Sequence, residues 1–386
     1  MPTPRYLLNN KKSASNRIPR EINRNLLFNQ IRMNQPISRA ELARTSGLQR
    51  STVSVIVEEL IAERWIIEGA IGQSARGRKP TFLHLNGHRA VLALDVHPTQ
   101  TLIAIIDLSG KIIAQDTIIL PANPQRVIAA ILAAIRTMFA KYKDYTFEGI
   151  GMSLPGRFNP GLEKSIFAPN IDWPIGRLKS RVEQATGLPV VVDNVANACA
   201  LSEVWFGSSD GAHDLVVVNV SEGIGTGIFA NGQLMRGEGG VAGEFGHVQL
   251  DPNGIKCGCG GQGCWETVAS NRAGMRYYRE SSSKSLASFE ELLQLAESSD
   301  PRAMKALDLM CVALGRGMRM IALALAPNEI VVVGDITTLW SVVKPKIEAE
   351  IRRYPMVAVP KLRAAQEGNK ARLRSAVALI MSGKLL

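Results

Sequence analysis

The chain has 386 residues, which is long enough for two or three domains with a substantial core, and 46% of the residues are apolar, as in an ordinary globular protein. No apolar run reaches the length that a bilayer crossing needs, which excludes a helical membrane protein. Residues 1–20 lack the apolar core of a signal peptide, and their composition predicts a disordered tail. We therefore expect a cytoplasmic protein.

The net charge of +11 is concentrated near the N-terminus. Residues 1–86 contain fourteen Lys and Arg but only six Asp and Glu, whereas the rest of the chain is close to neutral. A basic segment attached to a near-neutral body indicates a nucleic-acid-binding module joined to a different domain.

Two short helices are predicted first in this basic segment. Residues 23–34 form one helix, whose inward side chains we expect to be Leu26, Leu27 and Ile31. Ser38 followed by Glu41 is a capping box that begins a second helix, and Gly47 suits the left-handed turn that ends it.

A third helix is predicted to begin near Arg50. Its buried stripe follows the spacing i, i+3, i+4, i+7, i+8 and consists of Val53, Ile56, Val57, Leu60 and Ile61. The residues left facing outward at its start are Arg50, Ser51, Thr52, Ser54 and Val55. In a helix-turn-helix protein this end of the helix reads the edges of DNA bases, and Val55 is suited to a thymine methyl group.

Two strands, residues 65–71 and 81–85, are predicted to form a hairpin after the third helix. The tip, residues 72–80, is rich in glycine and carries the basic side chains Arg76, Arg78 and Lys79. Three helices followed by a basic hairpin predict a winged helix-turn-helix domain over residues 21–86, whose wing contacts the DNA backbone or minor groove. The alternative is a winged helix that contacts another protein.

From about residue 88 the pattern alternates between strands and helices, which indicates an α/β body. Predicted strands include residues 90–96, 101–107, 111–117, 215–220 and 329–335. Helices are predicted at residues 127–139 and 197–207, and long helices are expected between the strands at 223–232 and 329–335.

A glycine-rich loop near the middle of the body contains four possible metal ligands, which are His247, Cys257, Cys259 and Cys264. One imidazole and three thiolates are a donor set that zinc prefers in closed tetrahedral sites, and the intervening glycines allow the loop to turn tightly. We predict a structural Zn²⁺ ion here. The alternative is a disulfide with two buried free thiols.

The same loop resembles the signature of the ROK family of repressors, uncharacterised reading frames and sugar kinases, which reads GExGH followed by CxCGxxGCxE. The matching residues are Glu244, His247, the three cysteines and Glu266. The resemblance extends from about residue 23 to the C-terminus. It implies a two-lobed, actin-like (ribonuclease H-like) ATPase and sugar-kinase fold, with residues 87–197 and 368–386 in the first lobe and 198–367 in the second.

ROK kinases have three catalytic motifs that this chain has lost. Where the kinases have a DxGGT phosphate turn, this chain has Asp-Val-His-Pro-Thr at residues 95–99, and proline has no N–H to offer a phosphate. Val195 stands where the family has a catalytic aspartate, and a valine accepts no proton. The late GG motif reads Gly334-Asp335. One phosphate turn, residues 223–227, survives. Because the three other motifs are lost, we expect no catalysis.

The resemblance also implies a set of sugar contacts, which are Asn194, Glu244, His247 and Glu266. Amides and carboxylates suit vicinal hydroxyl groups, and His247 serves both roles if one ring nitrogen binds zinc while the other faces the sugar. Asn170 and Trp173 are further candidates for closing the cleft. Their alternative roles are a satisfied loop amide and a half-buried core tryptophan.

These features predict a sugar-responsive transcriptional regulator built on an inactive sugar-kinase body, and we expect it to be a repressor. Its partners are expected to be a double-stranded DNA operator, a small sugar or sugar derivative, and a second copy in a homodimer or higher homo-oligomer. The alternative function is an active ROK sugar kinase with a DNA-binding head. A third hypothesis is a regulator controlled by protein partners without a sugar.

Overall fold

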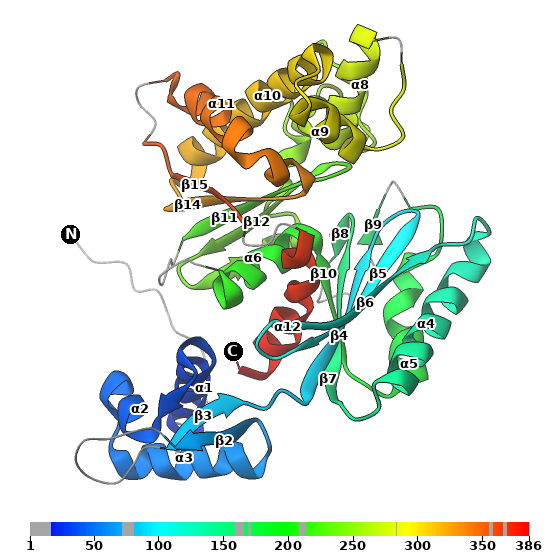
Figure 1. Cartoon of the computed structure of the whole chain (residues 1–386). Helices are drawn as coiled ribbons and strands as arrows, with labels where there is room; N and C mark the ends of the chain where they lie inside the picture. The colour runs from blue at the N-terminus through cyan, green and yellow to red at the C-terminus, as the bar shows by residue number, and fades with distance from the viewer. Residues whose placement is uncertain are drawn as a thin grey trace. The chain divides into compact units, whose positions relative to one another are not determined.

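A computed structural model describes residues 17–71, 81–158, 166–168, 171–207, 214–282, 284–354, 358–365 and 369–385 (Figure 1). The chain divides into two compact units with the main boundary after Gly87. Among the described residues, none of the helices combines the length and the apolar composition that a bilayer crossing requires. Residues 1–16 of the predicted tail and the tip of the hairpin, with Arg76, Arg78 and Lys79, lie outside the described residues. Residues 17–20 were predicted to be disordered but are helical, because the first helix begins at Arg17 rather than at residue 23.

The first unit combines helices with a small sheet. Its described elements are α1 (Arg17–Asn34), β1 (Ile37–Ser38), α2 (Arg39–Ser46), α3 (Arg50–Ala62), β2 (Ile66–Ile71) and β3 (Thr81–Leu85). The strands form an antiparallel sheet in the order β1-β3-β2. The predicted helix ends of α2 are confirmed, because the Ser38 hydroxyl accepts a hydrogen bond from the Glu41 N–H at 3.2 Å and Gly47 has a φ of 71°.

The core of the first unit differs from the prediction at two positions. Leu27 and Ile31 are buried as expected, but Leu26 is 38% exposed, and Phe28 is buried in its place. The buried face of α1 is centred on positions 27, 28 and 31, so position 26 lies about a quarter turn outside it. In α3 the predicted stripe is buried except for Ile61, which is only half-buried near the helix end.

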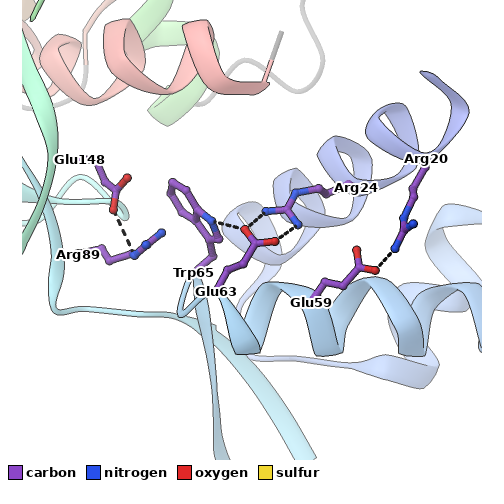
Figure 2. A network of polar contacts seen from close by, with 7 residues as sticks. All are labelled: Arg20, Arg24, Glu59, Glu63, Trp65, Arg89 and Glu148. Carbon is purple, nitrogen blue, oxygen red and sulfur yellow. Dashed lines mark hydrogen bonds and ion pairs between the residues drawn. The ribbon is translucent and has the colours of Figure 1, made fainter. Parts of the chain in front are cut away.

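Ion pairs join α1 to α3 along their exposed sides (Figure 2). Arg24 donates two hydrogen bonds to the carboxylate of Glu63, at 2.9 and 2.6 Å, and Arg20 pairs with Glu59. The indole N–H of Trp65 also donates to Glu63 at 3.1 Å. Pairs that remain open to water contribute about 0–1 kcal/mol each, so the buried core must hold this unit together.

The second unit is built on two five-stranded sheets. The first sheet has the order β10-β7-β4-β5-β6, in which β10, β7 and β4 are parallel and β4, β5 and β6 are antiparallel. Its strands are β4 (Arg89–Val96), β5 (Gln100–Asp107), β6 (Ile112–Ile119), β7 (Thr146–Leu154) and β10 (Val190–Asn194), with the short pair β8 (Arg157–Phe158) and β9 (Ile166–Phe167) beside it.

Helices cover both faces of the first sheet. The residues of α4 (Val127–Lys141) and α5 (Leu178–Thr186) form one hydrophobic core with inward side chains of β4, β5, β7 and β10. The other face packs against α12 (Asn369–Leu385), the last helix of the chain. A Cβ atom at Gly151 would lie 2.4 Å from the Cα of Ala376, so this strand needs glycine for α12 to approach. Arg89 and Glu148 form an ion pair across β4 and β7 at 3.2 Å (Figure 2).

The second sheet has the order β13-β12-β11-β14-β15. Its strands are β11 (Leu215–Val220), β12 (Ile224–Ala230), β13 (Gln233–Met235), β14 (Glu329–Val333) and β15 (Lys361–Ala364). One face packs against α6 (Val195–Phe206), which begins two residues before its predicted start. The helices that complete the other side are α7 (Trp265–Ala269), α8 (Asn271–Ser282), α9 (Phe289–Glu297), α10 (Pro301–Leu325) and α11 (Trp340–Arg352).

Candidate functional site

A cavity of about 240 Å³ lies between the two sheets of the second unit. Both sheets contribute to it, because β10 ends at Asn194 and the turn between β11 and β12 contains Gly223. Its wall includes the predicted sugar contacts Asn194, Glu244, His247 and Glu266. The cavity therefore brings together four residues that lie up to seventy-two positions apart in the sequence, from Asn194 to Glu266.

Four possible metal ligands converge beside this cavity. One ligand atom from each of His247, Cys257, Cys259 and Cys264 lies within 4.8 Å of all the others. His247 Nδ1 is 3.6 Å from the Cys257 sulfur, and the sulfurs of Cys259 and Cys264 are 3.7 Å apart. All the cysteines are free thiols, which contradicts the alternative of a disulfide. One imidazole nitrogen and three sulfurs fit a tetrahedral zinc ion in number, type and spacing.

The position of this loop is fixed at its C-terminal end by close packing. Trp265, which follows the last cysteine, is fully buried against Gly317 of α10, where a Cβ atom would lie 1.9 Å from the ring. Its indole N–H donates to the Ala313 carbonyl at 2.9 Å. Because Trp265 lies between Cys264 and Glu266 in the sequence, this anchor positions a metal ligand and a cavity residue together.

The ring of His247 lies between the cysteine cluster and the cavity residue Glu244. Its Nδ1 faces Cys257 and lies 3.5 Å from Glu266, whereas its Nε2 lies 3.6 Å from Glu244. Burial raises the pKa of Glu244, a rise that His247 and Arg157 oppose and Glu266 increases. The two ring nitrogens thus face different partners, which is the arrangement that a shared metal and ligand role needs.

Asn194 has a structural role in addition to its place in the cavity. Its side-chain oxygen caps α6 by accepting a hydrogen bond from the Asn197 N–H at 2.7 Å. Its amide N–H₂ group and the second lone pair of that oxygen remain for a ligand. Asn170 lies outside the described residues. Trp173 is 4% exposed and belongs to the core of the first sheet, so the core role rather than the cleft role is correct for it.

Sequence reasoning missed two arginines at the cavity edge. Asp193, Ser153 and Asp95 lie in register at the ends of β10, β7 and β4. Arg372 of α12 contacts Asp95 through its Nη2 and Nε atoms, at 3.0 and 2.9 Å. Arg236 donates two hydrogen bonds to Asp193, at 2.8 and 3.1 Å. In the sequence Arg372 stands between Lys370 and Arg374, each two positions away, so no local signal marked it as the partner of a buried carboxylate.

Asp95 has no capacity left for another ligand. Besides Arg372, it accepts hydrogen bonds from Ser153 Oγ at 2.8 Å and from His97 Nε2 at 3.0 Å. Burial by itself would raise the pKa of Asp95, but Arg372 and His97 reverse this effect and hold the pKa well below its usual range. The carboxylate at the first lost phosphate motif is therefore ionised and fully paired.

The surviving glycine turn is accounted for by packing. A Cβ atom at Gly227 would lie 2.2 Å from the Ala196 carbonyl, and one at Gly223 would lie 2.6 Å from a carboxylate oxygen of Glu266. Val195 is 7% exposed and lines the cavity as the first residue of α6. These glycines allow α6 and Glu266 to approach β12, whether or not a phosphate ever binds there.

The first unit presents the predicted DNA-contacting residues at the start of α3. Arg50, Ser51 and Val55 are exposed, with Val55 at 52%, and Thr52 and Ser54 are half-buried. Outward side chains at this end of the third helix are what a helix-turn-helix protein requires.

Two α/β lobes around a cleft, with a long terminal helix returning to the first lobe, define an actin-like fold. The family model described as "ROK family" matches residues 91–382, and the chain belongs to that family. The chain is 33% identical to a xylose repressor of Bacillus spizizenii, over 88% of this chain and 89% of the relative.

Two solved structures extend this comparison. A ROK family transcriptional regulator, described as a homolog of the E. coli MLC protein, has a TM-score of 0.78 and 27% identity, covering 95% of this chain and 97% of that one. A ROK glucokinase from Streptomyces griseus, in complex with glucose and AMPPNP, has a TM-score of 0.68 and 30% identity. It covers 76% of this chain and 100% of its own, so the kinase has no counterpart for about a quarter of this chain.

Proposed function

We propose that this protein is a sugar-responsive transcriptional repressor that binds DNA through its first unit and a sugar in the cleft of its second. The observation that carries the proposal is the presence in one chain of a helix-turn-helix unit with an exposed α3 start and a cavity lined by Asn194, Glu244, His247 and Glu266. The similarity to a xylose repressor and to a ROK transcriptional regulator over nearly the whole chain supports it.

The metal in this proposal is a structural zinc ion. His247 through Nδ1, together with Cys257, Cys259 and Cys264, would hold it, and its chemistry would be limited to fixing the loop. The loop in turn presents Glu244 and Glu266 to the sugar, so the metal acts through the positions of these two carboxylates.

We propose further that the kinase-like unit transfers no phosphate. Val195 provides no general base, and Asp95 is fully occupied by Arg372, His97 and Ser153. A general base contributes roughly 10²–10⁴-fold to a rate, and an occupied carboxylate adds a second obstacle. The competing function, an active sugar kinase with a DNA-binding head, is favoured only by the likeness to glucokinases.

Regulation would follow from a difference in the affinity of the sugar for two arrangements of the lobes. A sugar that contacts both sheets favours one arrangement of the lobes, and that arrangement has a lower affinity for DNA. In a homodimer, the two first units would then no longer match the spacing of operator half-sites.

The test is an anisotropy titration of an operator complex with pentoses, hexoses and their phosphates, using the wild type and Glu244→Gln. The substitution keeps the size of the side chain but replaces a charged acceptor. Hydrogen bonds to charged groups contribute about 1.5–3 kcal/mol, so the variant needs roughly tenfold more sugar, or more, to release DNA. Its affinity for the operator without sugar stays at the wild-type value. Equal sugar sensitivity in the two proteins would place the sugar site elsewhere.

A further inference from the structure

The two lobes of the second unit are connected without a loop at the cavity. The last residue of β10 in the first sheet is Asn194, and the next residue, Val195, begins α6, which packs on the second sheet. Glu203 of α6 also pairs with Arg363 of β15 at 2.8 Å, which ties this helix to the second sheet. A change in the angle between the sheets must therefore be absorbed in part next to Asn194, since the chain crosses a second time between β15 and α12.

One ion pair spans this junction. Asp193, which is 1% exposed at the end of β10, receives two hydrogen bonds on its Oδ2 from Arg236, which directly follows β13 of the second sheet. Its other oxygen accepts the N–H of Asn194 at 2.8 Å and the side-chain N–H of Asn197 at 3.0 Å. The carboxylate thus connects the second sheet to the cap of α6.

Both partners of the pair are adjacent to proposed sugar contacts. Asp193 precedes Asn194 in the chain. The Arg236 carbonyl accepts a hydrogen bond from the Ala242 N–H at 2.9 Å, which closes the turn that leads to Glu244. The pair is therefore a short connection between the residues that would bind the sugar from the first lobe and those that would bind it from the second.

The exposure of the two partners differs in a way that permits opening. A buried carboxylate without its cation is costly, so Asp193 favours the paired arrangement. The Arg236 side chain is 38% exposed, however, and its guanidinium has access to water when the pair breaks. The contact can thus separate without unfolding either lobe.

We infer that Arg236 is a positioning residue, which, with Asp193, holds the two halves of the sugar site at the separation that binding requires. The inference deepens the proposed function and rests on it for the identity of the ligand. Without Arg236, the junction at Asn194 loosens. Part of the free energy of sugar binding is then needed to order the junction, and the observed affinity for the sugar falls.

The first experiment measures amide hydrogen exchange in the sugar-free, full-length protein. Arg236→Gln removes the charge and keeps a polar side chain, Arg236→Lys restores the charge, and Arg316→Gln is the matched control, since Arg316 pairs with Glu350 away from the cavity at 3.6 Å. We expect roughly tenfold faster exchange at the amides of Asn194, Asn197 and Ala242 in Arg236→Gln. Partial recovery is expected in Arg236→Lys and no change in the control.

The second experiment measures the dissociation constant of the sugar that releases the wild-type protein from its operator. Arg236→Gln is expected to bind that sugar about tenfold more weakly, with unchanged operator affinity and zinc content. Wild-type exchange rates at the three amides would overturn the inference. A wild-type protein that binds none of the pentoses, hexoses or sugar phosphates would instead contradict the proposed function, while the exchange result still decides the role of Arg236.

Discussion

Val195 begins α6 at the point where the chain crosses between the two sheets, and it lines the cavity with an apolar side chain. Across the cavity edge, Asp95 is paired with Arg372 and His97. The loss of the proton acceptor and the occupation of the neighbouring carboxylate are separate changes. Reversing one of them leaves the other in place.

Val195→Asp is accordingly expected to leave ATP-dependent phosphorylation of hexoses at the background level. If the general base were the only missing part, the substitution would raise the rate by roughly 10²–10⁴-fold. The measurement is a coupled kinase assay on the wild type, Val195→Asp and a Glu244→Ala reference that lacks a proposed sugar contact. Turnover in the wild type well above the reference would establish the kinase function instead.

Residues close together in the sequence were predictable, and residues that meet only in the fold were not. His247, Cys257, Cys259 and Cys264 share one loop, so their convergence follows from local turns. Arg372 and Asp95 lie 277 positions apart, and no local pattern links them. Leu26 was wrongly predicted to be buried. The sequence shows apolar residues at positions 26, 27 and 28, and it does not show which of them faces the rest of the unit.

At the scale of elements, the loop that contains His247 and the three clustered cysteines is anchored by a buried tryptophan. Trp265 packs against Gly317, which leaves no room for a side chain in α10 at that turn. The buried strands β4, β11 and β14 were predicted to within two residues at each end, because buried strands appear as continuous apolar runs, whereas β13 and β15 were not predicted. The turn at residues 223–227 was interpreted as a phosphate turn, although packing against α6 explains Gly227, just as the approach of α12 explains Gly151 of β7.

We predict one zinc ion per chain and its loss in Cys259→Ser. The substitution removes one of the four ligands that a closed tetrahedral zinc site needs, and a structural metal contributes directly to local folding. The check is metal analysis of protein prepared without chelators, together with protease sensitivity of the 243–266 loop.

The matched control for this prediction is Cys311→Ala. Cys311 is a fully buried thiol of α10 that takes no part in the cluster. This variant is expected to lose stability through the cavity it creates but to retain its zinc. Metal-free wild-type protein, or zinc retained by Cys259→Ser, would be incompatible with the assignment.

At the scale of the whole molecule, the two units differ in charge as well as in fold. The excess of basic residues belongs to residues 1–86, and the body is nearly neutral. Binding to DNA is thus expected to depend on the first unit, and binding to a sugar on the second.

A protein that lacks residues 1–86 is expected to lose operator binding and to keep its sugar affinity. In the full-length protein, the logarithm of the binding constant should fall linearly with the logarithm of salt concentration, with a slope of roughly 0.9 for each phosphate that is neutralised. The measurements are fluorescence anisotropy with operator DNA and calorimetry with the sugar. Undiminished operator binding by the shortened protein would exclude DNA recognition by the first unit.

The return of α12 to the first sheet has a consequence for synthesis. The first unit ends at Gly87 and has its own core, so it is able to fold while most of the chain is still being made. One face of the first sheet of the body, in contrast, is covered only when the last helix has been made. That helix packs against Gly151 and contributes Arg372, which pairs with Asp95. A chain that terminates before α12 would contain a finished DNA-binding unit but a body with an uncovered sheet and a carboxylate that lacks its arginine partner. Premature termination would therefore produce molecules that recognise DNA and no longer respond to a sugar.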